Sequence, residues 1–329
     1  MANLSTQIGL SERLRLIPTM IVLAGCLATG IAAATAEAGG TLPSPSFLKY
    51  WKSGMAELSS YAITTSRYGE SRRAQGVMVF VYEEIDDKTR IKVESDRVPP
   101  ARRVPVLKLN NVLKFNTGIY DYSVMTSVFA GLSGPGVTRP FEPRKVSFSS
   151  QEWCGNVYHH VLPRAAGLAS TIHSYFEAEG DAETVIPYPK GSLFYEDEMP
   201  ILVRELDGEF LKPGESRAIN LVPSLWERRK RHVALAILEA TLTKNGPATL
   251  STPTGPRPAI KWTLAWKDHA MSYYVEAAPP GKLLAWDDGK GEKGELITSL
   301  RKTYWERNHN QDQPLRKELG LDYGVGSGG

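Results

Sequence analysis

Apolar and polar positions alternate with a period of two along much of the chain, which is the pattern of β-strands. Val146–Ser149 and Leu168–Ser174 alternate large apolar residues with small or polar ones, as in a sheet that buries one face. Gln75–Tyr82 is rich in β-branched and aromatic residues and is apolar on both faces. This second pattern predicts a central strand that is covered on each side.

The region 259–305 has the pattern of a meander. Its predicted strands are Ala259–Lys267, Ala270–Ala277, Lys282–Trp286 and Glu295–Trp305, separated by the turn sequences Asp268-His269, Pro279-Pro280-Gly281 and Asp287–Gly291. Arg231–Thr243 also alternates, so we predict a strand there, although its Ala, Leu and Glu residues also favour a helix. Helical turns are predicted over Tyr188–Leu206 and Gln313–Leu319, and a loose tail over Leu321–Gly329.

The amino-acid composition is that of an ordinary globular protein. Hydrophobic residues make up 42% and charged residues 23% of the 329 residues, values that are usual for folded domains. We divide the chain into an export signal at 1–36, a linker at 37–50, one β-rich domain at 51–312 and a C-terminal turn with a flexible tail at 313–329. The sequence therefore predicts a mostly β, single-domain protein with a sizeable core.

The N-terminal residues carry the features of an export signal. Arg13 and Arg15 precede an apolar run that starts at Ile17, and Leu23-Ala24-Gly25-Cys26 has the residues of a lipobox. Acylation of Cys26 with cleavage before it would leave a lipid-anchored protein, because two or three acyl chains give lasting membrane attachment. We therefore expect a lipoprotein of the bacterial periplasm, anchored to the outer or the inner membrane.

Two other outcomes for the N-terminus stay open. Signal peptidase could cut at Ala34-Thr35-Ala36 and release a soluble protein, because residues 27–36 are small and apolar where a lipoprotein tether is usually polar. Ile17–Ala36 could instead stay uncleaved and span the membrane as a weak transmembrane segment. If Cys26 is lipidated or removed, Cys154 is left as the single thiol and no intramolecular disulfide can form.

Charge gives no sign of a nucleic-acid partner. The chain has 39 basic and 36 acidic residues, a formal net charge of +3, without the basic surface that nucleic-acid binding needs. Its one basic cluster, Arg228–His232, could contact phosphate or a lipid headgroup. We expect a solvated turn there, because most short charge runs are solvated.

Motifs for common chemistries are missing from the sequence. Neither a Gly-x-Ser-x-Gly elbow nor a phosphate-binding loop occurs. Cys154 could act with His159 or His160, but residues six apart on one strand lie about 20 Å from each other, so we expect a buried thiol. With His173 as a third ligand, zinc would still be incompletely held. We predict no metal and no cofactor.

Carboxylates gather in two places. Glu177, Glu179, Asp181 and Glu183 form one group and Glu196-Asp197-Glu198 the other. Alternate residues of a strand share one face, so the first group could bind calcium or supply paired acids. We expect a solvated strand end, because Gly180 interrupts the strand. An acid-pair hydrolase that uses Glu177 and Glu179 stays open, provided that both lie in a pocket and one has a raised pKa.

Aromatic residues of the terminal meander are the better candidates for a binding site. The predicted ligand-binding residues are Trp262, Trp266, Tyr274, Trp286 and Trp305. Alternation places Trp262 and Trp266 on one face of a strand. Tyr and Trp suit the wall of an apolar pocket because each offers one polar atom. Simple core packing is the alternative.

Four segments resemble a family of uncharacterised bacterial cell-envelope proteins, over nearly all of the chain after the signal. They are Gly54–Tyr61, Ser66–Glu70, Phe115–Ser123 and Ser149–Gly155. Members sometimes carry the label septum formation inhibitor Maf, but Maf proteins have a Ser-x-Ser-Pro-Arg-Arg stretch, which residues 66–73 lack. The last third, with Gly281–Asp287, more distantly resembles periplasmic domains that look like lipoprotein-carrier half-barrels. The resemblance implies a large curved antiparallel sheet around an apolar concavity, with a few short helices.

These observations favour a non-enzymatic envelope protein. We expect it to bind an apolar or lipid ligand, or an envelope protein partner, on the concave face of its sheet, and to reach the membrane through Cys26. The acid-pair hydrolase is one alternative. A structural scaffold is the other, and it would show an exposed apolar patch or sheet edge and no enclosed cavity.

Overall fold

The computed structural model describes residues 43–252 and 255–321. Its first eight strands are β1 (Ala56–Arg67), β2 (Glu70–Asp86), β3 (Arg103–Thr117), β4 (Tyr120–Gly131), β5 (Glu142–Glu152), β6 (Gly155–Arg164), β7 (Gly167–Ser174) and β8 (Ala182–Ile186). The others are β9 (Leu193–Tyr195), β10 (Ser216–Val222), β11 (Leu238–Thr252), β12 (Gly255–Trp266), β13 (His269–Glu276), β14 (Leu283–Asp287) and β15 (Lys293–Lys302).

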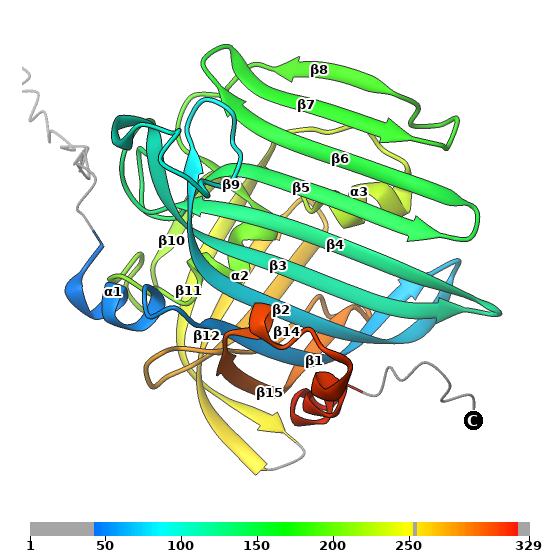
Figure 1. Cartoon of the computed structure of the whole chain (residues 1–329). Coiled ribbons are helices and arrows are strands. Elements are labelled where there is room, and N and C mark those ends of the chain that lie inside the picture. Colours follow the sequence, from blue (N-terminus) through cyan, green and yellow to red (C-terminus); the bar gives the residue numbers. More distant parts are fainter. Residues whose placement is uncertain (1–42, 253–254, 322–329) are drawn as a thin grey trace, which may run out of the picture. The chain divides into compact units, whose positions relative to one another are not determined.

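Helices are few and short. They are α1 (Pro45–Trp51), α2 (Met199–Leu202) and α3 (Leu225–Arg231), with the 3-10 helices η1 (Pro100–Arg102), η2 (Glu196–Glu198), η3 (Tyr304–Glu306) and η4 (Asn310–Leu319). Strands account for 55% and helices for 13% of the structure. The predicted mostly β fold, a large open curved sheet with a few short helices, is confirmed (Figure 1). None of the described helices is long and apolar enough to cross a membrane.

All fifteen strands belong to one sheet, in the order β8-β7-β6-β5-β4-β3-β2-β1-β15-β14-β13-β12-β11-β10-β9. Neighbouring strands are antiparallel, except that β9 and β10 run parallel. The first and last strands pair near the middle of the sheet, with Tyr61 opposite Leu296. This pairing joins two meanders into one sheet and leaves β8 and β9 as its edges.

The sheet curves enough for its β9 edge to return toward β5. Arg139, which precedes β5, donates one hydrogen bond to the backbone oxygen of Leu193 in β9 (3.0 Å) and another to Glu198 in η2 (2.6 Å). On α3, Trp226 stacks on Phe148 of β5 at a ring distance of 6.2 Å. Helices η2 and α3, with α2 between them in the sequence, therefore form a helical segment against the concave face of β3–β5.

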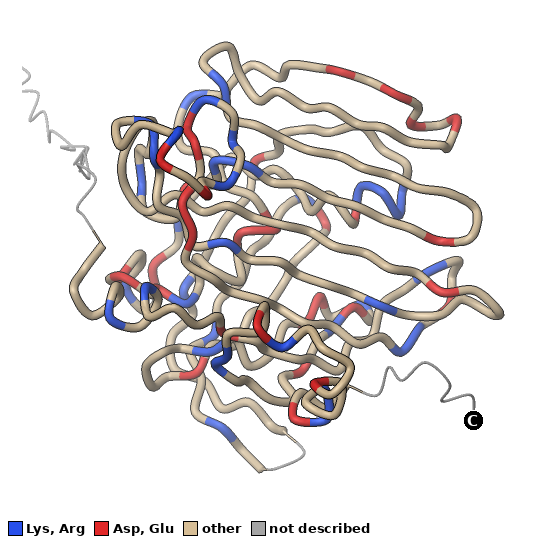
Figure 2. The backbone as a smooth tube through the Cα atoms, in the orientation of Figure 1, with Lys and Arg blue, Asp and Glu red and all other residues tan. Residues whose placement is uncertain are grey.

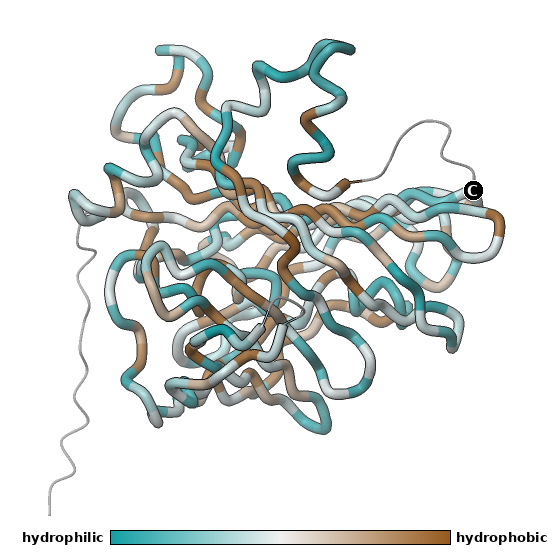
Figure 3. Tube along the Cα trace, turned by 90° about the horizontal axis from the view of Figure 1, so that it is seen from below, coloured by the Kyte–Doolittle hydropathy of each residue, from teal (hydrophilic) through white to brown (hydrophobic). Residues whose placement is uncertain are grey.

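The core lies between that concave face and the enclosed segment. Brown and teal segments alternate along the strands in Figure 3, as the period of two predicts. One large buried cluster includes Phe80, Leu109, Phe148 and Trp262. A small second cluster on the other face of the sheet packs Leu58 and Val81 against other apolar side chains, Leu319 of η4 among them. Both faces of β1 and β2 are therefore covered there.

Helix α1 is part of this packing. Pro45 occupies its first turn, and the hydroxyl of Ser44 accepts the amide of Phe47 (3.2 Å). Phe47 and Trp51 are buried in the core. Residues 45–50 of the predicted linker thus fold onto the domain.

A fully buried ion pair joins four parts of the fold. Arg204, just after α2, donates to both carboxylate oxygens of Glu57 in β1 (2.9 and 3.1 Å) and to the backbone oxygen of Gly281 before β14 (2.8 Å). The Arg204 and Glu57 side chains are 0% and 1% exposed. The hydroxyl of Tyr50 in α1 donates a further hydrogen bond to Glu57 (3.0 Å).

Most predicted elements are present. The segments 75–82, 146–149 and 168–174 lie in β2, β5 and β7, the four strands of the terminal meander are β12 to β15, and helical turns occur at 196–202 and 310–319. The predicted strand over 231–243 is wrong in its first half, because α3 ends at Arg231 and β11 begins at Leu238. Between them, His232 has a left-handed backbone (φ 52°) that breaks any strand. The predicted tail falls almost wholly outside the described residues.

Substitution of Arg204 by Met should destabilise the fold by about 3–5 kcal/mol, because Glu57 would stay buried without its partner. Urea unfolding measures this free energy. Lys293→Met, which removes the partner of the exposed Glu295, should cost less than about 1 kcal/mol. The double variant Glu57→Leu/Arg204→Met should regain most of the loss. Equal costs for Arg204→Met and Lys293→Met would show that the buried pair has no special role.

Candidate ligand-binding site

Helix α3 is held on the concave side by groups that are distant in sequence. At its N-terminus, the amide of Ser224 donates to Glu196 (2.9 Å) and the amide of Leu225 to Asp197 (3.0 Å). At its C-terminus, Arg67 of β1 donates to the backbone oxygen of Lys230 (3.1 Å). Carboxyl oxygens thus accept the free amides at the first turn of the helix, and a cation meets the negative end of the helix dipole.

Most of the basic side chains of α3 have acidic partners. Arg229 lies 3.0 Å and His232 lies 2.9 Å from Glu179, and Lys230 lies 2.7 Å from Glu292. Arg231 is half exposed and approaches Glu227 at 3.9 Å. In Figure 2 the backbone tube is blue at the Lys and Arg positions of α3. Each of these four positive or ionisable groups is therefore balanced by a carboxylate.

Arg228 is the exception. The residue is only 9% exposed, and its Nε has no hydrogen-bond partner. Among the described residues, its guanidinium forms no hydrogen bond, ion pair or ring contact with another side chain. The prediction of a solvated turn is therefore wrong for Arg228 and Arg229, which are buried because α3 packs against the concave face.

Two cavities meet at Arg228. One, of about 140 Å³, lies between α3 and strands β5–β8 and is lined by apolar side chains that include Phe148, Val157, Ile172 and Leu225. The other, of about 470 Å³, reaches toward β12 and β13 and is lined by Trp266, Met271 and several charged residues. Arg228 and Val233 line both cavities. The larger volume is within the range of about 300–1,000 Å³ that small-molecule pockets have.

Strand register explains the wall of the smaller cavity. Phe148, His159, Ile172 and Ala182 are successive cross-strand partners in β5, β6, β7 and β8. Cross-strand partners share one face of a sheet, so all four side chains point to the concave side. Ser170 occupies the adjacent inward position, two residues before Ile172.

His159 and Ser170 form a buried polar pair in this wall. His159 Nε2 lies 2.7 Å from Ser170 Oγ. Burial, together with the charges of Arg228 and His160, lowers the pKa of His159 to about 4. His159 is therefore neutral near pH 7 and adds no positive charge to the cavity. A serine beside a histidine resembles a nucleophile and its base, but an imidazole with so low a pKa is a weak base.

The larger cavity contains a carboxyl group that burial keeps protonated. Burial raises the pKa of Glu196 to about 8, and the negative charges of Asp197 and Glu227 act in the same direction. Burial also raises the pKa of Glu198 to about 7, although Arg139 opposes the shift. Glu196 and Glu198 are both buried.

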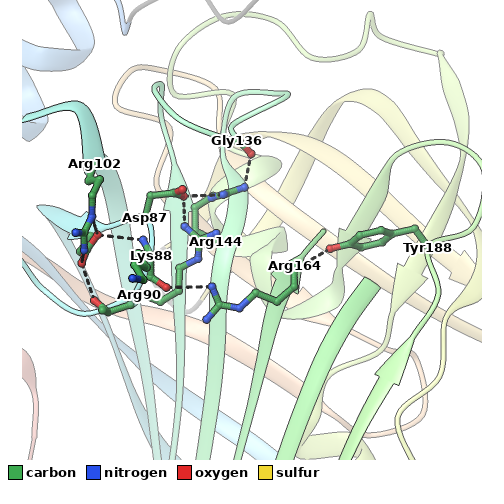
Figure 4. A network of polar contacts seen from close by, with 10 residues as sticks. Asp87, Lys88, Arg90, Arg102, Gly136, Arg144, Arg164 and Tyr188 are labelled. Carbon is green, nitrogen blue, oxygen red and sulfur yellow. Dashed lines mark hydrogen bonds and ion pairs between the residues drawn. The ribbon is translucent and has the colours of Figure 1, made fainter. Parts of the chain in front are cut away.

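A second group of arginines, of which Arg90 and Arg144 are buried, contrasts with Arg228 (Figure 4). Arg90 and Arg144 both bind Asp87, and Arg144 also binds the backbone oxygen of Gly136. Arg164 donates to the backbone oxygen of Lys88 (3.1 Å). Hydrogen bonds from Arg102 lower the pKa of Asp86 to about 2. Each guanidinium of this group has a protein partner, so the group ties the ends of β2–β6 together.

The structure separates the predicted aromatic residues. Trp262, Tyr273 and Trp286 are cross-strand partners on one face. Trp262 is buried and borders a cleft of about 610 Å³ beside α1, whereas Trp266 lines the 470 Å³ cavity. Trp286 packs on Tyr61 at a ring distance of 4.9 Å. Tyr274 alternates to the other face of β13, and Trp305 is exposed in η3.

The other candidates lie apart. Cys154 is exposed in the β5–β6 turn, so the expected buried thiol is wrong. Glu177 is exposed, while Glu179 is engaged by Arg229 and by the hydroxyl of Ser174 (2.6 Å). In the described residues, no group of three or more His, Cys, Asp or Glu side chains could hold a metal ion. Cys26 lies outside the described residues.

No family model, curated protein or solved structure matches this chain. The site therefore has to be interpreted from its own geometry. Sequence reasoning missed Arg228, Ser170 and Glu196 as site residues. The alternation of Leu168–Ser174 already placed Ser170 on one face of a strand, but the burial of the other two depends on contacts distant in sequence.

Glu196→Gln should flatten the pH dependence of stability. The folded-state pKa of about 8 lies above the ordinary 4.5, so the folded protein keeps a proton that the unfolded chain releases. This contribution to stability is lost as the pH rises from about 4.5 to 8. Gln cannot ionise, so the variant should exceed the wild type by about 4 kcal/mol at pH 8 and nearly match it near pH 4.5.

Urea unfolding at a series of pH values measures the difference. The exposed Glu177→Gln is the matched control and should follow the wild-type curve. Parallel curves for Glu196→Gln and the wild type would contradict a protonated Glu196.

Proposed function

We propose that the protein is a non-enzymatic cell-envelope protein that binds an apolar ligand on the concave face of its sheet. The observation that carries this proposal is the pair of cavities beside α3, which meet at Arg228 and Val233. Apolar walls with a few directed polar groups are typical of small-molecule sites. In the smaller cavity the polar groups are His159, Ser170, Thr184 and Arg228, together with Glu179, Arg229 and His232, which pair with one another.

The arrangement favours binding over the two alternatives. The acid-pair hydrolase needs free carboxylates in one pocket, whereas Glu177 is exposed and Glu179 is engaged in an ion pair. A purely structural scaffold needs no ligand cavity, yet two partly open cavities lie beside α3. A protein partner could add to the exposed edge strand β8, but that edge does not account for the cavities.

The proposed location is the bacterial periplasm, with Cys26 as the membrane anchor. Support comes from the lipobox and the apolar run before it. The described domain begins at residue 43, so a short segment would connect it to the anchor.

Mass spectrometry of the protein purified from membranes tests the anchor. We expect a mass increment of a triacylated Cys26 in the wild type and its loss in Cys26→Ser. A wild-type chain that begins after Ala36 and carries no acyl groups would contradict the anchor without bearing on the cavities.

Filling the smaller cavity should abolish binding of an apolar probe. Ala182 of β8 is exposed to solvent and lines this cavity, so Ala182→Trp should fold and occupy it. N-Phenyl-1-naphthylamine is neutral and brightens in apolar surroundings; one of its rings would fill the smaller cavity and the rest would extend into the adjoining 470 Å³ cavity. We expect it to bind the wild type and to bind Ala182→Trp at least tenfold more weakly, measured by fluorescence titration.

Glu183→Trp is the matched control, because Glu183 faces the other side of the same strand. It should bind the probe like the wild type. Equal affinities of the probe for the wild type and Ala182→Trp, or no binding to the wild type, would overturn the proposed ligand site.

A further inference from the structure

The unmatched charge of Arg228 is the feature that neither the fold nor α3 explains. A buried charge without a partner is strongly unfavourable, and arginine cannot escape the cost by losing its proton. The residue is 9% exposed, and no carboxylate of the described residues reaches it. An anion bound in the cavity would remove the imbalance.

The surroundings of Arg228 leave one positive charge to be matched. Arg229 and His232 share Glu179, and Lys230 and Arg231 together are matched by Glu227 and Glu292. His159 is neutral, because burial lowers its pKa to about 4. Glu196 keeps its proton near neutral pH, because burial raises its pKa to about 8. A ligand with a single negative charge would therefore balance the site.

We propose that Arg228 binds the carboxylate of a ligand whose apolar tail fills the 140 Å³ cavity. This inference rests on the proposed function and specifies the class of ligand. A guanidinium offers two parallel N–H groups that match the two oxygens of a carboxylate. A phosphate monoester carries about −1.5 to −2 charges at neutral pH, which would leave an unmatched negative charge close to Glu179.

The size of the smaller cavity sets the size of the tail. An engineered apolar cavity of about 150 Å³ holds a benzene molecule, and this cavity measures about 140 Å³. A tail of about six carbon atoms therefore fits. Phe148, Val157, Ile172 and Leu225 would contact it. Longer ligands would have to extend into the 470 Å³ cavity, which also borders Arg228.

Isothermal titration calorimetry with four probes tests the assignment on the intact protein. Hexanoate has both the carboxylate and the apolar tail, 1-hexanol has the tail without the carboxylate, and acetate has the carboxylate without the tail. Hexyl phosphate has the same tail with a phosphate in place of the carboxylate. We expect hexanoate to bind with a Kd at least tenfold lower than each of the other three. Acetate thereby distinguishes a free small anion from an apolar carboxylic acid.

Arg228→Met should remove the advantage of hexanoate over 1-hexanol while the neutral fluorescent probe still binds. The matched control is Arg231→Met on the same helix, where the side chain is 54% exposed. It should keep the advantage of hexanoate. Arg228→Lys keeps the charge but not the paired N–H groups, so it should weaken hexanoate binding by less than Arg228→Met does. If Arg228→Met fails to fold, the hexanoate affinity of Arg228→Lys still tests the assignment.

Three results would overturn the assignment. They are equal binding of hexanoate and 1-hexanol by the wild type, tighter binding of hexyl phosphate than of hexanoate, and an unchanged hexanoate Kd in Arg228→Met. In each case, continued binding of the neutral probe would leave the proposed function standing. Failure of the neutral probe to bind, with hexanoate still bound through Arg228, would contradict the general apolar-ligand function and leave the carboxylate site.

Discussion

The buried ion pair of Arg204 and Glu57 connects the centre of the sheet with the segment that the sheet encloses. Glu57 belongs to β1, which pairs with both β2 and β15 and so joins the two meanders. Arg204 follows α2 and also binds the backbone before β14. Because both charges are removed from water, their geometry tolerates little displacement. The position of α2 relative to the sheet is thereby fixed, and with it the chain that leads on to α3.

The enclosed segment brings an unusual amount of charge into the concavity. Its acidic residues Glu196 and Asp197 accept the first amides of α3, and its basic residues meet Glu179 and Glu292 from other elements. This mutual neutralisation lets a strongly polar seven-residue helix lie against aromatic side chains of β3–β5. Since nearly every charge is matched, the isolation of Arg228 is informative and gives the concave face a specific chemistry.

The polar groups on the sheet are of two kinds: some bind other parts of the protein, and others line the smaller cavity. Each guanidinium of the arginine network at the ends of β2–β6 binds an acceptor of the protein, and Arg204 binds Glu57. Three of the groups that line the smaller cavity differ: His159 and Ser170 bind each other, and the Arg228 guanidinium has no side-chain partner among the described residues. This difference is the basis of the proposed site for a carboxylate with an apolar tail.

The sequence by itself determined the strands, because inward and outward positions alternate within each one, and it determined most turns, because Gly, Pro and Asp act locally. It therefore predicted β2, β5, β7 and the meander β12–β15, and it placed Trp262 and Trp266 on one face. Only the tertiary structure decided what the charged residues do. Charged runs such as Arg228–His232 and Glu196–Glu198 are typical of solvent-exposed segments. Their burial depends on partners that lie tens of residues away in the sequence. A local pattern contains no information about such partners, so the strands could be predicted and the site could not.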